Sequence, residues 1–279
     1  MNIKGVGIIG CGLMGTSIAV VCLKKGFDIL MYDITKEIVQ DGIKKIEKVL
    51  NKTEGGAENR KALMRRVKGT LELRDFNSRD IVIEAIVEKL GEKTKIFGEL
   101  DRVCKENAIL ASNTSSLSII DIAASTKRIE QVLGMHFIAP AYMFPVVEII
   151  RTIRTSEKVL ETVKEFGTSL GMEVFVTKDY PGFVINNIQI PMLLQAVRVL
   201  EKDLATREVI DMVMTKGMGH RIGPLALVDY VGIDTIFNMA QSIYEETKDM
   251  IWAPPLLLRK MVAAGWLGRK TGKGFYSYD

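Results

Sequence analysis

The chain contains two histidines, His136 and His220, and histidine is the side chain that ordinarily titrates near neutral pH. His136 lies near the end of an apolar segment, and Glu148 follows twelve residues later within Val-Val-Glu-Ile-Ile. Because an unpaired carboxylate is costly in apolar surroundings, we expect Glu148 to bind one imidazole nitrogen if the two segments are neighbours. The other nitrogen could then move a substrate proton. A purely structural His–Glu hydrogen bond is the alternative, and His220 is predicted to lie in a loop.

Three glycines, Gly10, Gly12 and Gly15, have Gly-x-Gly-x-x-Gly spacing after an apolar segment, and Asp33 follows the last of them by eighteen positions. Gly10 would allow a tight turn, Gly12 would let the backbone approach a pyrophosphate, and Gly15 would let the next helix pack closely. The carboxylate of Asp33 would bind the ribose hydroxyls and repel a ribose 2′-phosphate. This pattern predicts an NAD site, with NAD favoured over NADP, at Gly10, Gly12, Leu13, Met14, Gly15 and Asp33.

Short apolar segments alternate with helical segments over the first part of the chain, which predicts a parallel sheet covered by helices. Residues 36–68 predict an inserted, charged helical hairpin. After Asp179 the pattern is helical, with Gly and Pro punctuation. We therefore expect an α/β, Rossmann-like doubly wound domain at residues 1–180 and a smaller all-helical domain at residues 181–279.

Composition narrows the class of protein. The 279 residues are 47% hydrophobic, which is enough for a large core, and the net charge of +4 is too small to indicate nucleic-acid binding. No apolar segment has the length of about 18 to 20 residues that spans a bilayer, and the first predicted strand leaves no room for a signal peptide. Cys11, Cys22 and Cys104 show no disulfide or zinc pattern. We expect a cytoplasmic protein without metal or membrane binding.

Two polar segments, Ala-Ser-Asn-Thr-Ser-Ser-Leu at 111–117 and Asp-Tyr-Pro-Gly-Phe-Val-Ile-Asn at 179–186, follow strands. Each alone fits helix capping or a solvated helix Asn. Along the whole chain, the ordered series Gly-Cys-Gly-Leu-Met-Gly, Asn-Thr-Ser-Ser-Leu, Gly-Met-His-Phe-Ile-Ala-Pro with Glu148, Asp-Tyr-Pro-Gly-Phe-Val-Ile-Asn and the terminal Gly-Lys-Gly-Phe-Tyr resembles the L-3-hydroxyacyl-CoA dehydrogenase family. The form that the chain is most similar to is the short 3-hydroxybutyryl-CoA dehydrogenase type.

The resemblance implies the reversible, NAD-dependent oxidation of an L-3-hydroxyacyl-CoA to the 3-ketoacyl-CoA, as in the β-oxidation of fatty acids. It implies a homodimer formed through the C-terminal helical domain. It also implies that His136 is the base, that Glu148 orients it, and that Ser115 and Asn186 contact the substrate oxygen or His136. The residues implied near the nicotinamide half of NAD are Glu88, Lys93, Asn113 and Ser115, with Asp33 at the adenosine ribose.

The chain departs from the family pattern beside the base. The family usually has His-Phe-Phe-Asn-Pro, whereas this chain has Ala139 in place of the Asn, and residues 141–145 are bulkier than usual. An altered acyl pocket is therefore expected. The anionic CoA could bind a basic face of the hairpin, although a solvated face explains the same residues, which are Lys44, Lys45, Lys48, Lys52, Lys61, Arg65 and Arg66.

Two other functions stay open from the sequence. One is an NAD-dependent dehydrogenase of a free 3-hydroxy acid, as in the gulonate and carnitine dehydrogenase relatives. The other is a catalytically silent NAD-binding homologue, which Ala139 suggests.

Overall fold

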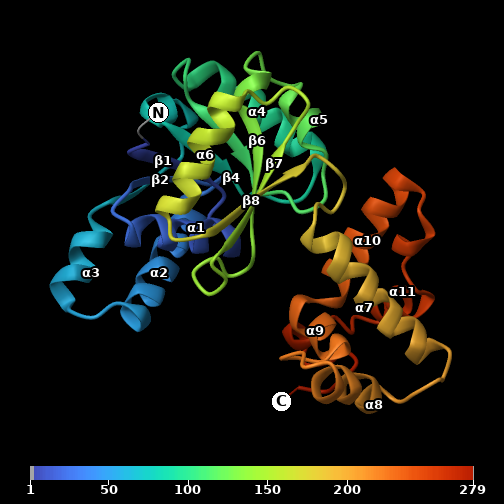
Figure 1. Cartoon of the computed structure of the whole chain (residues 1–279). Helices are drawn as coiled ribbons and strands as arrows, with labels where there is room; N and C mark the ends of the chain where they lie inside the picture. Colours follow the sequence, from blue (N-terminus) through green and yellow to red (C-terminus); the bar gives the residue numbers. More distant parts are fainter. Residues whose placement is uncertain (1–2, 279) are drawn as a thin grey trace. The chain divides into compact units, whose positions relative to one another are not determined.

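The computed structural model describes residues 3–278. The chain divides between Tyr180 and Pro181 into two compact units, which we call the first unit and the second unit (Figure 1). Each unit has its own hydrophobic core. In the described residues, no helix is both long enough and apolar enough to cross a membrane.

The first unit is built on an eight-stranded sheet with the order β3-β2-β1-β4-β5-β6-β7-β8. Neighbouring strands are parallel except β6 and β7, which are antiparallel. The strands are β1 (Gly5–Ile9), β2 (Asp28–Tyr32), β3 (Val67–Thr70), β4 (Ile81–Glu84), β5 (Ile109–Ser112), β6 (Val132–Phe137), β7 (Val146–Arg151) and β8 (Glu173–Lys178). The Rossmann-like prediction is confirmed: the strands of the first part of the chain, β1 to β6, are parallel as predicted, and β7 and β8 run against them.

Helices lie on both faces of this sheet (Figure 1). They are α1 (Leu13–Lys24), α2 (Lys36–Thr53), α3 (Ala57–Met64), α4 (Leu90–Val103), α5 (Ile119–Ala123) and α6 (Glu157–Ser169). The mainly apolar α1 is buried along most of its length, whereas α2 buries one stripe that includes Val39, Ile46 and Leu50. Thr35 caps α2 by accepting a hydrogen bond from the Ile38 N–H.

The predicted hairpin is partly wrong at its end. Within the hairpin predicted at residues 36–68, the periodicity predicts a second helix over residues 57–67, but α3 ends at Met64 and the chain then forms the edge strand β3. Val67 is buried there against the core, and the Ile29 N–H donates to the Arg66 carbonyl at 2.8 Å. Pairing with β2 therefore decides the conformation of a segment whose own sequence is short and polar.

The second unit is helical, as expected, with α7 (Ile185–Glu201), α8 (Arg207–Met212), α9 (Pro224–Val231), α10 (Ile233–Thr247) and α11 (Leu256–Ala263). The sequence predicts one helix over residues 225–247, but Gly232 has a φ of 111° and separates α9 from α10. This positive φ is open to glycine and strained for other residues.

The terminal Gly-Lys-Gly-Phe-Tyr segment is fastened to α9 by one buried carboxylate. Asp229 accepts hydrogen bonds from the backbone N–H groups of Phe275 and Tyr276, both at 2.9 Å, and from the Tyr278 hydroxyl, also at 2.9 Å. A Cβ at Gly274 would lie 2.0 Å from the Asp229 carboxylate, so a side chain there would displace the tail. The hydrogen bonds to Asp229 therefore give the terminal Gly-Lys-Gly-Phe-Tyr motif a structural role within the second unit.

Candidate active site

His136 and Glu148 lie directly opposite each other on the antiparallel strands β6 and β7. Opposed residues of an antiparallel pair point to the same face of a sheet, so the two side chains meet. His136 Nδ1 and Glu148 Oε2 are 2.6 Å apart, and the two residues are 5% and 0% exposed. The reversal of β7 therefore creates the pair that the sequence spacing suggested.

The other imidazole nitrogen faces a hydroxyl. Ser115 Oγ lies 3.1 Å from His136 Nε2, on the segment that follows β5. A carboxylate accepts hydrogen bonds only, so we assign the ring proton of neutral His136 to Nδ1, where it is donated to Glu148. The lone pair on Nε2 then accepts from Ser115. The structure thus brings together three predicted site residues, Ser115, His136 and Glu148.

Glu88 holds the segment that carries Ser115. Its Oε1 accepts from the Thr114 hydroxyl at 2.5 Å and from the backbone N–H groups of Ser115 and Ser116 at 2.8 and 3.2 Å. Burial by itself would raise the pKa of Glu88, but the Lys93 ammonium and these donors hold that pKa below its usual range. Glu88 is therefore ionised at neutral pH.

Lys93 is buried, with 1% of its surface exposed, and its ammonium lies between two carboxylates. It donates to Glu84 Oε1 at 2.6 Å and lies 3.3 Å from Glu88 Oε2. The sequence prediction did not include Glu84, which ends strand β4 and is fully buried. An acidic residue that closes an otherwise apolar strand was the available signal.

Asn113 makes a contact inside the protein. Its side-chain oxygen accepts from the backbone N–H of Phe137 at 2.9 Å, and the residue is 8% exposed. This bond ties the segment after β5 to the strand residue that follows His136. The resemblance implies that Asn113 and Lys93 lie near the cofactor. Within the first unit, Asn113 binds the Phe137 N–H and Lys93 binds Glu84.

The glycine loop borders a cavity of about 390 Å³. A Cβ at Gly10 would lie 2.5 Å from the Ala85 carbonyl oxygen, and a Cβ at Gly15 would lie 1.8 Å from the Gly10 carbonyl oxygen. Protein packing thus accounts for these two glycines. Apart from Gly12 and its two chain neighbours, no atom of the described residues lies within 4 Å of the position of a Cβ at Gly12, which is the N-cap of α1 and provides no capping side chain. A bound phosphate is a physical reason for glycine at that position.

The remaining members of the predicted cofactor site also lie at this end of β1 and β2. Asp33 lines the cavity, and its two carboxylate oxygens accept from the backbone N–H groups of Cys11 and Ile34 at 2.7 and 2.8 Å. Leu13, which is 68% exposed, and Met14 form the first turn of α1. Asp33 therefore also holds the glycine loop in place.

Two predicted residues lie in the second unit. Asn186 is in the first turn of α7 and is 5% exposed, and its predicted contact with substrate or His136 stays a prediction. His220 lies in a loop, as expected. Among residues 3–278 there is no group of three or more His, Cys, Asp and Glu side chains that could hold a metal ion.

The comparisons with known proteins identify the family of the chain. A family model described as the 3-hydroxyacyl-CoA dehydrogenase NAD binding domain matches residues 5–180, and one described as the C-terminal domain of that enzyme matches residues 182–278. A probable 3-hydroxybutyryl-CoA dehydrogenase of Bacillus subtilis (strain 168) is 40% identical over 283 residues, covering 100% of this chain and 99% of that protein. The mitochondrial hydroxyacyl-coenzyme A dehydrogenase of Homo sapiens is 39% identical, covering 99% and 91%. The crystal structure of (S)-3-hydroxybutyryl-CoA dehydrogenase from Ralstonia eutropha has a TM-score of 0.94 at 40% identity and covers 100% of both chains. The chain belongs to the 3-hydroxyacyl-CoA dehydrogenase family.

Proposed function

We propose that the protein catalyses the reversible, NAD-dependent oxidation of an L-3-hydroxyacyl-CoA, such as 3-hydroxybutyryl-CoA, to the 3-ketoacyl-CoA. The observation that carries the proposal is the hydrogen-bonded series Ser115, His136 and Glu148, in the same unit as a glycine loop suited to a dinucleotide. The curated relatives act on the same class of substrate according to their names.

In the oxidation, His136 Nε2 takes the proton from the substrate hydroxyl, and Glu148 stabilises the imidazolium that results. Ser115 donates to the substrate oxygen as negative charge develops on it. Asn186 is the predicted second donor to that oxygen. When bound, the nicotinamide supplies the acceptor for the hydrogen on C3. In the reduction, the imidazolium of His136 returns the proton to the oxygen.

We propose that NAD binds at the glycine loop and in the cavity that Asp33 lines. The phosphates would bind the N–H groups at the start of α1, beside Gly12, and Asp33 would bind the adenosine ribose. The open space at Gly12 fits such a group.

Replacing Asp33 by Ala should weaken NAD binding and reduce the discrimination against NADP. The carboxylate repels a ribose 2′-phosphate, so its loss should lower the ratio of kcat/KM for NADH over NADPH by about 10-fold. The matched variant is Asp33→Asn, which keeps an acceptor for the Cys11 N–H but not the charge. A fall of the ratio in both variants assigns the selectivity to the charge, and an unchanged ratio in both contradicts the proposal.

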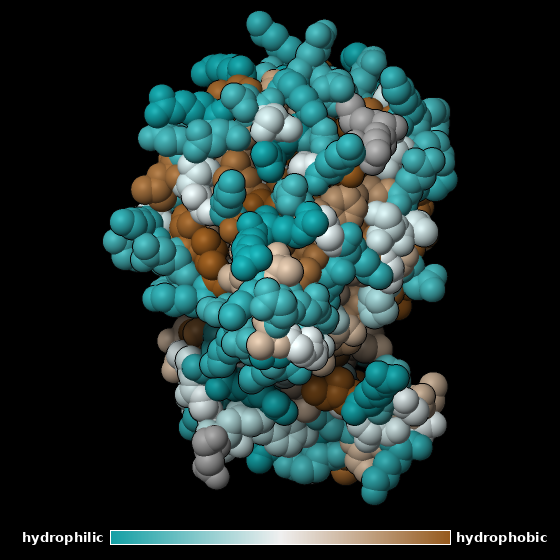
Figure 2. Space-filling model, turned by 90° about the vertical axis from the view of Figure 1, so that its left-hand side faces the viewer, coloured by the Kyte–Doolittle hydropathy of each residue, from teal (hydrophilic) through white to brown (hydrophobic). Residues whose placement is uncertain are grey.

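The CoA part of the substrate is proposed to bind the hairpin helix α2. Lys44 and Arg66 already pair with Asp41 and Asp28, whereas Lys45 and Lys48 line a cavity of about 250 Å³ together with Tyr142. Tyr142 belongs to residues 141–145, the segment that is bulkier than in the family. The same cavity is therefore lined by this segment and by two basic side chains of α2. Figure 2 shows the side of the molecule on which α2 and α3 lie in Figure 1, and most residues on that face are hydrophilic.

A homodimer is part of the proposal as well. The second unit has an apolar groove of about 370 Å³ on α7 and α8. Val209, Met212 and Val213 beside it are 42%, 44% and 49% exposed, which is typical of a surface that a partner covers. We propose that a second copy of the chain covers it.

The test of the proposed function is the initial rate of NADH oxidation with acetoacetyl-CoA compared with free acetoacetate, followed by acyl-CoA thioesters of graded length. We expect a rate that depends on the thioester and is largest with one group of acyl chains. A protein that binds NADH but oxidises it with none of the thioesters would overturn the proposal. A higher rate with the free acid would favour the free hydroxy acid alternative.

A further inference from the structure

The structure carries an inference about the buried ions Glu84, Lys93 and Glu88, which we call the carboxylate–lysine cluster. We propose that this cluster positions the Ser115 hydroxyl for the reaction, although none of its charges takes the substrate proton. The inference rests on the proposed function. It assigns Glu84 and Lys93 a role that acts through the protein, separate from the predicted contact of Lys93 with the cofactor.

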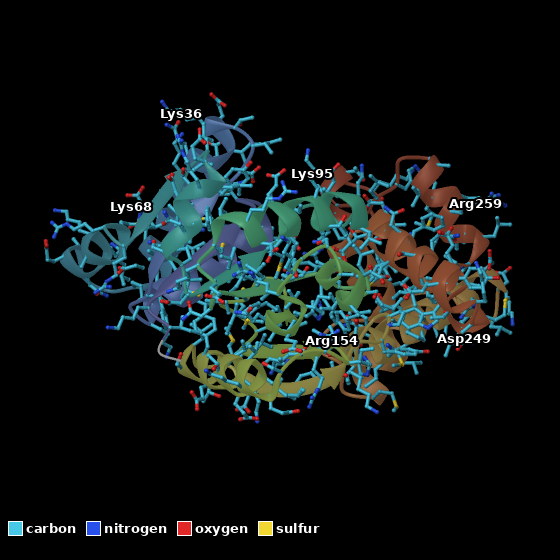
Figure 3. All side chains as sticks on the ribbon, turned by 90° about the horizontal axis from the view of Figure 1, so that it is seen from above. Lys36, Lys68, Lys95, Arg154, Asp249 and Arg259 are labelled. Atoms are coloured by element: carbon cyan, nitrogen blue, oxygen red, sulfur yellow. The ribbon has the colours of Figure 1, made fainter. Side chains whose placement is uncertain are left out.

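The burial of Lys93 indicates that its ammonium has a specific role inside the first unit. Lys95, two residues further along α4, is exposed and extends from the surface in Figure 3, whereas Lys93 is 1% exposed. Taking an ammonium out of water costs several kcal/mol, and only close partners of opposite charge offset this. Glu84 at 2.6 Å and Glu88 at 3.3 Å are those partners.

Glu84 joins the ends of two strands. Its Oε1 accepts from the Ile86 N–H at 2.7 Å as well as from Lys93, and its Oε2 accepts from the Ser112 hydroxyl at 2.7 Å. Glu84 and Ser112 are register partners at the ends of β4 and β5. The carboxylate thus fixes the point where the segment carrying Ser115 leaves the sheet.

Glu88 fixes the rest of that segment. Its Oε1 accepts four hydrogen bonds from three consecutive residues, namely from the Thr114 hydroxyl, the Ser115 N–H, and the N–H and hydroxyl of Ser116, while its Oε2 faces Lys93. Without the ammonium, Glu84 and Glu88 would be two close carboxylates with no cation between them, and they would repel each other. Lys93 therefore keeps Glu84 and Glu88 in the positions from which they bind Ser112 and residues 114–116.

This series of hydrogen bonds leads from the carboxylate–lysine cluster to His136, the proposed proton acceptor. Glu88 holds the backbone N–H of Ser115, and the Ser115 hydroxyl lies 3.1 Å from His136 Nε2. A displacement of about 1 Å in such a group can lower a rate by about 100-fold. Glu84 and Lys93 are thus positioning residues, and they act through Ser115.

The experiment is a double-mutant cycle with Lys93→Met and Ser115→Ala, measured as kcat for NADH oxidation with acetoacetyl-CoA. We expect each single substitution to lower kcat at least about 10-fold and the double substitution to lower it little further than Ser115→Ala, because both remove the same contact. Losses that multiply in the double variant would overturn the inference. If Lys93→Met does not fold, Glu84→Gln takes its place in the cycle.

The control is Asp101→Asn, which removes another ion pair made by α4. Asp101 pairs with Arg128 at 2.7 Å, and the two side chains are 11% and 10% exposed. This variant should have the wild-type kcat even if its melting temperature falls. An equal loss of kcat in Asp101→Asn would show a general packing effect and overturn the inference. A wild-type protein without thioester-dependent activity would refute the proposed function, whereas multiplicative losses in an active protein refute only the role of the cluster.

Discussion

Replacing His136 by Gln should lower kcat for NADH oxidation with acetoacetyl-CoA by about 10³-fold, since general acid–base catalysis contributes about 10² to 10⁴ to a rate. Gln occupies a similar volume, but its amide cannot take or return a proton at neutral pH. The glycine loop and Asp33 follow β1 and β2, whereas His136 lies on β6, so the Kd of NADH should change by no more than a few-fold. Initial rates and the fluorescence of bound NADH measure the two quantities.

The matched control is His220→Gln, which removes the second histidine of the chain. His220 lies in a loop of the second unit, and we expect this variant to keep the wild-type kcat. Near wild-type turnover by His136→Gln would show that another group moves the proton. A parallel loss of NADH binding would show that the substitution damaged the fold.

Replacing Glu148 by Gln should lower kcat by roughly 10²- to 10⁴-fold, by analogy with the loss of the carboxylate that orients the histidine of a serine protease. The amide that replaces the carboxylate would be neutral, so it would no longer stabilise the imidazolium, and its N–H₂ could bind Nδ1 and reverse the tautomer of His136. KM for the thioester should change little, because Glu148 is fully buried beneath the ring. Steady-state kinetics separate the two parameters.

Glu157→Gln is the control for that substitution. Glu157 pairs with Arg151 at the end of the same strand, β7, but its side chain is 68% exposed. We expect wild-type kinetics from this variant, as exposed ion pairs contribute little. A kcat for Glu148→Gln within a factor of about three of the wild-type value would contradict an orienting role for the carboxylate.

The sequence provided candidate site residues but did not establish the contacts between them. The apolar setting of His136 and Glu148 indicated a pair, but their meeting depends on the antiparallel pairing of β6 and β7. The alternation of strands and helices in the first part of the chain predicted the parallel pairing of β1 to β6 but gave no direction for β7. The direction of β7 follows from the short connection at residues 138–145, which is compatible with antiparallel neighbours and too short for a helical crossover.

The sequence also did not show in which direction the side chains of the site residues point. A motif can place Lys93 near the cofactor, but only the fold shows that its ammonium is buried against Glu84. Glu84 itself was missed because an acidic residue at the end of a strand is equally compatible with a solvated position. The strand β3 was missed for a related reason, as Val-Lys-Gly-Thr becomes a strand only beside β2.

The central claim is that Nε2 of His136 can accept the substrate proton because Glu148 holds the ring proton on Nδ1. The most direct test is ¹⁵N NMR of the imidazole nitrogens, which the chain simplifies because it has two histidines and the His220→Gln variant identifies the signals of His136. At a pH where His136 is neutral, we expect the proton on Nδ1 and an unprotonated Nε2. A neutral His136 with its proton on Nε2 would contradict the account.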